Sequence, residues 1–354
     1  MKSNYDILGN HIRLIDTRNR ESITDRVLGI NIDKFFMPSV ANVIGTDLSK
    51  YKLITKGKFA CNPMHVGRDE RLPVALYDED TPALVSPAYF MFEVIDDSLL
   101  NEDYLMMWFR RPEFDRICWL HTDGSVRGGI TWDDICRLEL PIPPIEKQLE
   151  IVNSYKAITE RIALKQKIND NLEATAFAIY RETFITSRSA NWNKGTLSDL
   201  LAVKYGKDHK HLADGTIPLY GSGGIMRYVE KSLYDKVSVL IPRKGTLSNV
   251  LFVDEPFWSV DTMFYTEISK PYAAKFIYYF VKSKDLAGMD TGSAVPSMSS
   301  EIIHSMELDI PDDETLISFD KCLCPLYKQI KINNQECDKL KSLQGILLTT
   351  ISSR

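Results

Sequence analysis

The chain has 354 residues, which at about 150 residues per domain predicts two domains or three. Hydrophobic residues make up 44% and charged residues 26%, a composition that excludes a disordered or collagen-like chain. The formal net charge of -5 argues against a protein that coats nucleic acid, and no apolar stretch approaches the roughly 18 residues of a membrane span.

The chain begins Met1-Lys2 without the apolar run of a secretory signal, and we therefore expect a cytoplasmic location. Its six cysteines are scattered, and no two of them form a Cys-x-x-Cys pair. A structural zinc site needs closely spaced soft ligands, and disulfides need an oxidising compartment. Neither is indicated, so we expect the thiols to be buried as small hydrophobic groups: Cys61, Cys118, Cys136, Cys322, Cys324 and Cys337.

The acidic average hides an uneven distribution of charge. From Asn10 to Arg71 there are eleven bases and seven acids, and from Val203 to Asn249 there are eight bases and four acids. The stretch from Leu72 to Phe109 carries eight acids and no base. Two basic segments in an acidic chain indicate a protein that contacts a polyanion on one side and another partner elsewhere.

In chain order, residues 1–143 predict a compact α+β globule, with short β-like runs between glycines and prolines and an aromatic-rich helix at 102–109. Residues 144–184 predict a long central helix, because apolar residues recur there at alternating steps of four and three. Such a seam is typical of a helix that packs along its length on another helix. Its apolar members are Ile151, Tyr155, Ile158, Ile162, Leu172 and Ile179.

Residues 185–311 predict a second globule of the same kind, with β-like runs at 236–241 and 263–268 and an aromatic-rich helix at 273–281. Residues 312–354 predict a second long helix with the same alternating steps. The apolar members of its seam are Phe319, Leu323, Leu326, Ile330, Leu340 and Leu347. We expect the two long helices to pack on each other through these seams.

The two halves of the chain are copies of one unit. Residues 124–149 align without gaps with residues 292–317, and eight of the 26 pairs are identical. Average residue usage gives about one or two identities by chance. Lys165 and Asn333 are equivalent in this alignment and interrupt both seams at the same level. The expected fold is α+β: two similar globules, each followed by a long helix, with the helices packed antiparallel as a coiled-coil-like spacer with pseudo-two-fold symmetry.

Four segments carry a resemblance to a known family. They are Ile217–Ile225 (IPLYGSGGI), Val239–Thr246 (VLIPRKGT), Phe257–Thr262 (FWSVDT) and Leu140–Gln148 (LPIPPIEKQ). Together with the order globule, helix, globule, helix, they resemble the DNA specificity subunit of type I restriction-modification systems over essentially the whole chain. The chain departs from the family pattern at Ser86–Tyr89, where a Ser/Asp-Thr pair is more usual, and at Asp312–Asp313, which replace Pro144–Ile145.

The resemblance implies a non-catalytic subunit that binds double-stranded DNA. Residues 1–143 and 185–311 are then target recognition domains, each for one half of a bipartite, asymmetric site, and the helices 144–184 and 312–354 are the spacer that sets the gap. The implied partners are two modification (methyltransferase) subunits and the restriction (translocase and endonuclease) subunits. Those partners use S-adenosylmethionine, ATP and Mg²⁺, whereas the resemblance implies no cofactor and no membrane contact for this chain.

Candidate DNA-binding residues lie in both basic segments. DNA affinity comes largely from lysine and arginine on phosphates, and specificity comes from contacts with base edges. The candidates of the second globule flank several glycines, which let the backbone approach a ligand closely. The candidates are Arg18, Arg20, His65, Arg68, Arg71 and Arg127 in the first globule, and Lys204, Lys207, Lys210, Arg227, Arg243, Lys244 and Asn249 in the second.

No residue is assigned to catalysis or to a metal. The Gly221–Gly224 run lacks the Gly-Lys-Ser/Thr end of a P-loop. Asn62–His65 lacks the second proline and the aromatic residue of an amino-methyltransferase loop. His209 and His211 have no further spaced ligands around them.

Two alternatives from other classes stay open. The acidic stretch 72–109 and the net charge favour a coiled-coil scaffold that binds proteins through two globular heads. A nuclease that uses Asp208 predicts Mg²⁺-dependent cutting by the isolated chain, abolished by Asp208→Ala. A DNA-binding subunit differs from the scaffold in its response to salt, because its affinity falls steeply as the salt concentration rises.

Overall fold

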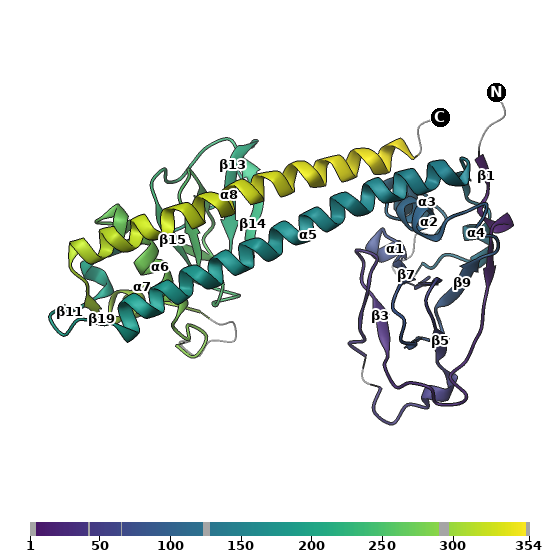
Figure 1. Ribbon diagram of the computed structural model, residues 1–354, viewed down its shortest axis with the longest axis horizontal. Coiled ribbons are helices and arrows are strands. Elements are labelled where there is room, and N and C mark those ends of the chain that lie inside the picture. Colours follow the sequence, from purple (N-terminus) through teal and green to yellow (C-terminus); the bar gives the residue numbers. More distant parts are fainter. Residues whose placement is uncertain (1–4, 42, 65, 123–127, 290–296, 352–354) are drawn as a thin grey trace. The chain divides into compact units, whose positions relative to one another are not determined.

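The computed structural model describes residues 5–351 except 42, 65, 123–127 and 290–296. The chain folds into two compact units. Unit 1 comprises Met1–Lys165 and Gln335–Arg354, and unit 2 comprises Gln166–Asn334. Two long helices contribute residues to both units, because α5 runs from Ile145 to Arg181 and α8 from Asp313 to Thr350 (Figure 1).

Unit 1 is built on an antiparallel sheet with the strand order β2-β9-β6-β7. These strands are β2 (Ile12–Leu14), β6 (Lys58–Cys61), β7 (Val74–Tyr77) and β9 (Phe90–Val94). The other elements of unit 1, besides the long helices, are β1 (Tyr5–Ile7), β3 (Leu28–Ile30), β4 (Phe36–Pro38), β5 (Lys52–Ile54), β8 (Ala83–Val85), β10 (Glu139–Pro141), α1 (Val66–Asp69), α2 (Glu102–Phe109), α3 (Pro112–Leu120) and α4 (Trp132–Cys136).

Unit 2 contains two sheets, with the strand orders β12-β18-β15-β16 and β14-β13-β17. The strands of the first are β12 (Leu201–Tyr205), β15 (Ser238–Pro242), β16 (Leu251–Val253) and β18 (Met263–Ile268). The strands of the second are β13 (Asp214–Gly221), β14 (Gly224–Val229) and β17 (Trp258–Ser259). Unit 2 also contains β11 (Asn193–Thr196), β19 (Glu307–Ile310), α6 (Ala274–Lys282) and α7 (Ser300–His304).

The main sheets of the two units share one topology. In each, the first strand pairs antiparallel with the last, and the last pairs with the first strand of a hairpin: β2-β9-β6-β7 in unit 1 and β12-β18-β15-β16 in unit 2. Short parallel contacts recur as well, between Val27 and Leu84 in unit 1 and between β13 and β17 in unit 2. The prediction of two similar α+β globules is therefore confirmed.

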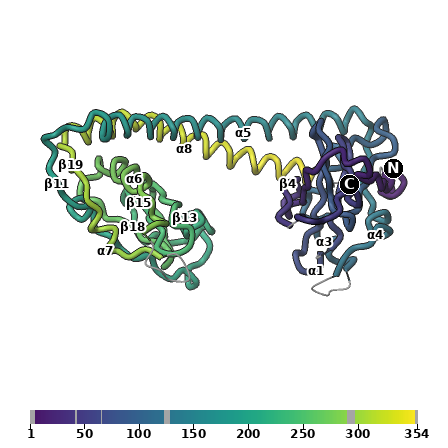
Figure 2. Tube along the Cα trace, turned by 90° about the horizontal axis from the view of Figure 1, so that it is seen from below, coloured from purple at the N-terminus to yellow at the C-terminus, as the bar shows by residue number. Residues whose placement is uncertain are grey.

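The equivalence extends to the segments that precede the long helices. β1 pairs antiparallel with β10 just before α5. In the same way, β11 pairs antiparallel with β19 just before α8 (Figure 2). The backbone N–H of Ile130 donates to the carbonyl oxygen of Pro63 at 3.2 Å, and that of Met298 donates to Arg243 at 2.9 Å. Because Ile130 and Met298 are equivalent in the repeat, Pro63 and Arg243 occupy equivalent places.

The core of each unit forms around one aromatic-rich helix. In unit 1, α2 begins after Asn101, whose Oδ1 accepts a hydrogen bond from the Tyr104 N–H, and the helix is buried from Tyr104 to Phe109. In unit 2, α6 is buried from Ala274 to Val281. A helix that is buried on every side needs apolar residues all round, which explains the run of aromatic side chains.

Helices α5 and α8 pack on each other antiparallel, as the alternating seams predict. In unit 1, Arg161 and Lys165 of α5 form ion pairs with Glu336 of α8. These two cations lower the pKa of the Glu336 carboxyl. In unit 2, the ring of Tyr180 contacts Phe319 with 6.3 Å between centroids. As the residue numbers rise along α5, those of the α8 partners fall, which defines the antiparallel direction.

The predicted seam residues are all buried or half-buried, and Ile151, Tyr155, Ile179 and Leu326 among them pack against the hydrophobic cores of the two units. Ile162, Phe319 and Leu323 are buried. The others are half-buried: Ile151, Tyr155, Ile158, Leu172, Ile179, Leu326, Ile330, Leu340 and Leu347. Helix α5 ends at Arg181, and one wider π-helical turn continues to Thr186.

The expectation that every cysteine is buried is wrong for two of the six. Cys61, Cys118 and Cys337 are buried and Cys136 is half-buried, but Cys322 and Cys324 are exposed on α8. The reason is helical geometry. Phe319 and Leu323 lie on the buried side of α8, so Cys322 and Cys324, which are adjacent to Leu323 in the sequence, point to other sides of the helix.

A buried amide pair interrupts the apolar seam inside unit 2. The side-chain Nδ2 of Asn333 donates to Oδ1 of Asn169 at 2.8 Å, and Oδ1 of Asn333 accepts from Gln329 Nε2 at 2.9 Å. Asn333 is 1% exposed and Asn169 is 9% exposed, so water does not replace these bonds freely. A polar pair at a seam position lowers stability and fixes the register of two helices.

We expect Asn333→Leu to lower the free energy of unfolding by about 1–3 kcal/mol, because the buried Asn169 oxygen loses its donor. The double variant Asn169→Leu with Asn333→Leu should recover this loss, since both polar groups are removed together. Urea denaturation followed by circular dichroism measures both. A single variant as stable as the wild type would show that the amide pair contributes nothing.

Candidate nucleic-acid interface

Four loops of unit 2 meet through backbone and side-chain contacts, and we call them the loop face: residues 206–213, 221–224, 243–250 and 259–262. The Lys207 N–H donates to the Ser259 carbonyl oxygen at 2.9 Å, and the Arg243 N–H donates to that of Thr262 at 2.8 Å. Asn249 Nδ2 donates to the Ser222 carbonyl oxygen at 2.8 Å. These bonds hold together segments that are up to 56 residues apart in the sequence, counted from 206 to 262.

Two glycines make the close approach of these loops possible. A Cβ atom on Gly206 would lie 2.0 Å from the Val260 carbonyl oxygen, which is backbone and does not move aside like a side chain. Gly245 has φ +88°, a conformation that side-chain-bearing residues rarely adopt, and a Cβ there would meet Ser222 Oγ at 2.9 Å. The glycines of the basic segment therefore shape the loop face itself.

We expect Gly206→Ala to lower the free energy of unfolding by about 1–3 kcal/mol, because the added methyl group forces the 206–213 loop away from Val260. Gly223→Ala is the matched control, since a Cβ on Gly223 meets no atom within 4 Å. Chemical denaturation of the two variants measures the difference. Equal stability of the two would contradict the close packing of these loops.

Five of the predicted DNA-binding cations form ion pairs inside their own unit. The pairs are Arg18 with Asp16, Arg68 with Asp69, Arg71 with Asp33, Lys204 with Glu267, and Arg227 with Asp214. Arg227 also donates to the carbonyl oxygens of His209 and Leu212, so it holds the 206–213 loop against β14. A cation that is already paired with a carboxylate contributes less to binding a phosphate.

The remaining predicted cations form no ion pair with any residue that the structure describes. They are Arg20, Lys207, Lys210, Arg243 and Lys244, and His65 and Arg127 lie outside the described residues. Four of the five unpaired cations belong to the loop face of unit 2. The structure thus brings most of the predicted residues of the second globule, including Asn249, to one set of loops, whereas Lys204 lies on β12 and pairs with Glu267 of β18.

The predicted residues of unit 1 are less gathered. Arg18 lies beside β5, where its Nη1 donates to the Lys50 carbonyl oxygen at 2.7 Å, and Arg20 follows in the same loop. Arg68 and Arg71 lie in and after α1, and Arg71 pairs with Asp33. Among the described residues, no hydrogen bond or ion pair of these four arginines links the first loop to the second.

Two exposed side chains next to the loop face are absent from the sequence-based candidates. Tyr205, at the end of β12, is 51% exposed, and the Arg243 guanidinium lies over its ring at 5.3 Å. Met226 is 57% exposed and lies at the register shift between β13 and β14. The sequence indicates Tyr205 only weakly, as an aromatic residue directly before Gly206-Lys207, and a β-bulge such as that at Met226 leaves no clear pattern in a sequence.

Burial also sets the protonation of a nearby tyrosine. Tyr220, at the end of β13, has its pKa raised to about 12, first by burial and then by the carboxylate of Glu255. Its hydroxyl therefore keeps its proton at neutral pH. Tyr220 accordingly adds no negative charge beside the cations of the loop face.

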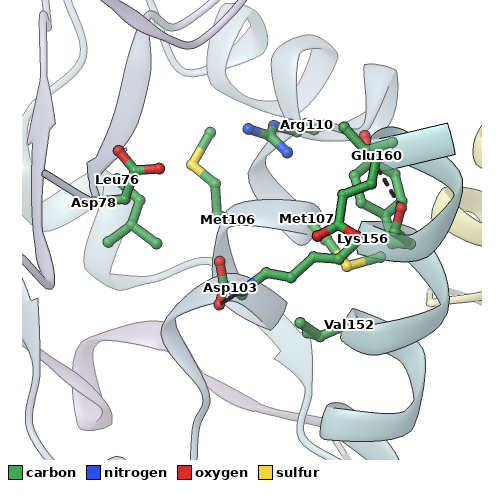
Figure 3. Close-up of a pocket in the computed structure, with 11 residues that line it drawn as sticks. Leu76, Asp78, Asp103, Met106, Met107, Arg110, Val152, Lys156 and Glu160 are labelled. Atoms are coloured by element: carbon green, nitrogen blue, oxygen red, sulfur yellow. Dashed lines mark hydrogen bonds and ion pairs between the residues drawn. The ribbon is translucent and has the colours of Figure 1, made fainter. Parts of the chain in front are cut away.

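A cavity of about 390 Å³ lies in unit 1 between α2 and the first turns of α5 (Figure 3). Met106, Met107 and Val152 supply apolar surface, and the Asp103 carboxylate pairs with Lys156 Nζ at 2.5 Å beside them. The rest of the lining mixes acidic and basic side chains, among them Asp78, Glu160 and Arg110.

Within the described ranges, no group of three or more histidine, cysteine, aspartate and glutamate side chains is placed to hold a metal ion. No described helix combines the length and the apolar character that crossing a membrane requires.

In fold, the chain is similar to the crystal structure of the type I restriction-modification system S subunit from M. genitalium, with a TM-score of 0.61, 15% identity, and coverage of 100% of this chain and 97% of that one. Two other solved structures are also similar. One is described as the structural basis of complex assembly and conformational transition of the type I R-M system (TM-score 0.48, 14% identity, 98% and 96% coverage). The other is the HsdS subunit from Thermoanaerobacter tengcongensis (TM-score 0.35, 14% identity, 98% and 95% coverage).

The fold is therefore that of the type I restriction-modification specificity subunits, as the sequence resemblance indicates. Residues 189–342 match the model of the type I restriction modification DNA specificity domain. The matched part contains the whole loop face. A search of curated proteins finds no significant match.

Proposed function

We propose that the chain is the DNA specificity subunit of a type I restriction-modification complex. Each unit recognises one half of a bipartite, asymmetric DNA site, and the antiparallel helices α5 and α8 set the gap between the halves. The single observation that carries the proposal is the loop face, where Lys207, Lys210, Arg243 and Lys244 stand without ion-pair partners among the described residues inside a matched DNA specificity domain. Unpaired cations on exposed loops are what phosphate binding requires.

The proposal assigns no chemical step to this chain. Two modification subunits transfer the methyl group of S-adenosylmethionine, and restriction subunits use ATP and Mg²⁺ to move along DNA and cut it. The chain acts in the cytoplasm, where it positions those partners on DNA. The shared topology of the two units supports this arrangement, because two similar surfaces suit two identical partners.

Ion pairs inside unit 1 weaken one support of the scaffold alternative, the acidic stretch 72–109. Half of the eight acids between Leu72 and Phe109 are paired with bases from other parts of unit 1. Arg26 pairs with Glu79, Lys56 with Asp80, Arg13 and Lys58 with Glu93, and Lys156 with Asp103. These ion pairs neutralise half of the acidic segment inside its own unit, which lowers the charge that it offers to a protein partner.

Methylome sequencing of a host that carries the chain with its modification subunit tests the proposal. We expect methylation at one bipartite sequence with a fixed gap, absent when the gene for this chain is deleted. Methylation that is independent of this chain would contradict the proposal. Binding to proteins that persists at high salt would favour the scaffold, and Mg²⁺-dependent cutting by the isolated chain, lost in Asp208→Ala, would favour the nuclease.

A further inference from the structure

Arg243 is held on the loop face by one backbone hydrogen bond and by two contacts of its guanidinium. Its backbone N–H donates to Thr262, and its Nη1 donates to the Asp261 carbonyl oxygen at 3.2 Å. The guanidinium carbon lies 5.3 Å from the centroid of the Tyr205 ring, a distance at which a cation is attracted to the face of an aromatic ring. None of these contacts uses a carboxylate.

The other N–H groups of this guanidinium have no acceptor among the described residues, and the side chain is half-exposed. Arginine presents its N–H groups as a rigid planar fork, which fits the two acceptors O6 and N7 on the major-groove edge of guanine. A fork that is already oriented loses little conformational freedom when it binds. The neighbouring Lys244 is exposed, and its side chain forms no hydrogen bond or ion pair with the described residues, as suits a flexible phosphate contact.

Tyr205 is itself fixed by the sheet. It is the last residue of β12 and pairs in register with Phe264 of β18, and its ring contacts the Phe264 ring edge-on with 5.1 Å between centroids. The ring is nevertheless 51% exposed, an unusual amount for a large side chain that packs on a core phenylalanine. Its outer face is the surface on which Arg243 rests.

We propose that Arg243 recognises a guanine in the half-site bound by unit 2, and that Tyr205 is the positioning residue that orients its guanidinium. This inference rests on the proposed function of the chain. It goes further by naming the base that is recognised, guanine, and the two side chains that select it. It also separates Arg243, which contacts a base edge, from Lys207, Lys210 and Lys244, which contact phosphates.

Unit 1 lacks this device, so the inference concerns one half-site alone. Pro63 occupies the place of Arg243, as the equivalent hydrogen bonds from Ile130 and Met298 show. The strand pairing of the main sheets places Asp16 where unit 2 has Tyr205. The Cys61–Phe90 pair of unit 1 corresponds to the Ile241–Phe264 pair of unit 2. The Ile12–Val94 pair likewise corresponds to the Leu201–Ile268 pair, and Asp16 and Tyr205 each follow four residues after Ile12 and Leu201. Neither proline nor aspartate supplies a cationic fork.

The test selects DNA from a pool of randomised duplexes with the full-length chain bound to its modification subunits. The retained duplexes are sequenced for the wild type, Arg243→Lys, Tyr205→Leu and Tyr205→Phe. Arg243→Lys keeps the charge and removes the planar fork, whereas Tyr205→Phe keeps the ring and Tyr205→Leu removes it. Thermal melting of each variant checks that the fold is retained.

We expect Arg243→Lys to lower the preference for guanine at one position of one half-site by about tenfold to a hundredfold, with the other half-site unchanged. Tyr205→Leu should weaken the preference at that same position, and Tyr205→Phe should retain it. The inference is overturned if Arg243→Lys keeps the full preference, if the affected base is not guanine, or if Tyr205→Leu lowers enrichment equally at every position. In those cases the wild type still selects a bipartite site and the proposed function stands, whereas a wild type that selects no sequence overturns both.

Discussion

Replacing Lys207 and Lys244 together by alanine should weaken DNA binding without changing the sequence that is preferred. Both side chains are exposed on the loop face and form no ion pair with the described residues. Each lysine that contacts a phosphate releases about 0.9 counterion, so the slope of log affinity against log salt should become shallower by about two. Affinity at low salt should fall by about tenfold for each lysine. Fluorescence anisotropy with a labelled duplex, titrated at several salt concentrations, measures both quantities.

The matched control replaces Lys270 and Lys331 by alanine. This double variant removes the same charge from unit 2, but Lys270 pairs with Asp313 and Lys331 with Asp254, and neither lysine belongs to the loop face. Its salt slope should equal that of the wild type. If the two double variants lowered the slope alike, the effect would come from net charge, and the loop face would not be the DNA-binding surface.

Lengthening both long helices by seven residues should widen the gap between the two half-sites by about three base pairs. Seven helical residues add about 10.5 Å at 1.5 Å each, and B-DNA rises about 3.4 Å for each base pair. The insertions belong between Lys165 and Gln166 in α5 and between Asn334 and Gln335 in α8, where one unit gives way to the other. A heptad keeps the alternating seam in phase, so the side chains on both sides still meet.

The control inserts four residues at the same place in α5 alone. With that insertion, the Arg161–Glu336 pair and the Asn169–Asn333 pair can no longer form at the same time. We therefore expect the two helices not to pack and the complex not to assemble. Methylome sequencing or duplex selection gives the gap directly. A gap that is unchanged by the paired heptad insertions would refute the role of α5 and α8 as the spacer.

The parts of the fold that the sequence specifies well are those governed by local patterns. The alternating steps of four and three along α5 and α8 repeat for many turns, and a seam of that length indicates a helix that packs along another helix. The aromatic-rich helix at 102–109 coincides with α2, since a helix buried on all sides reads as a continuous apolar run. The repeat at a spacing of 168 residues likewise indicated that one globule fold occurs twice.

The ion-pair and hydrogen-bond partners of individual charged side chains could not be predicted from the sequence. Arg227 and Arg243 look alike in the sequence, yet Asp214 and two carbonyl oxygens hold the first. The guanidinium of the second forms one hydrogen bond with the described part of the chain. The Asp16, Asp33 and Glu267 carboxylates that neutralise other candidates come from turns and strands whose positions depend on sheet pairing. Such pairings join residues far apart in the chain.

The sequence by itself determined the duplicated α+β architecture, the two long helices and the basic character of the second globule, because periodicity, proline and glycine act on the chain locally. Only the tertiary structure decided which cations remain unpaired, which loops meet, and that Tyr205 supports Arg243 where the first unit has Asp16 and Pro63. The physical reason is that a side chain's free hydrogen-bonding capacity depends on neighbours brought by strand register and loop packing, and no short stretch of sequence encodes those neighbours.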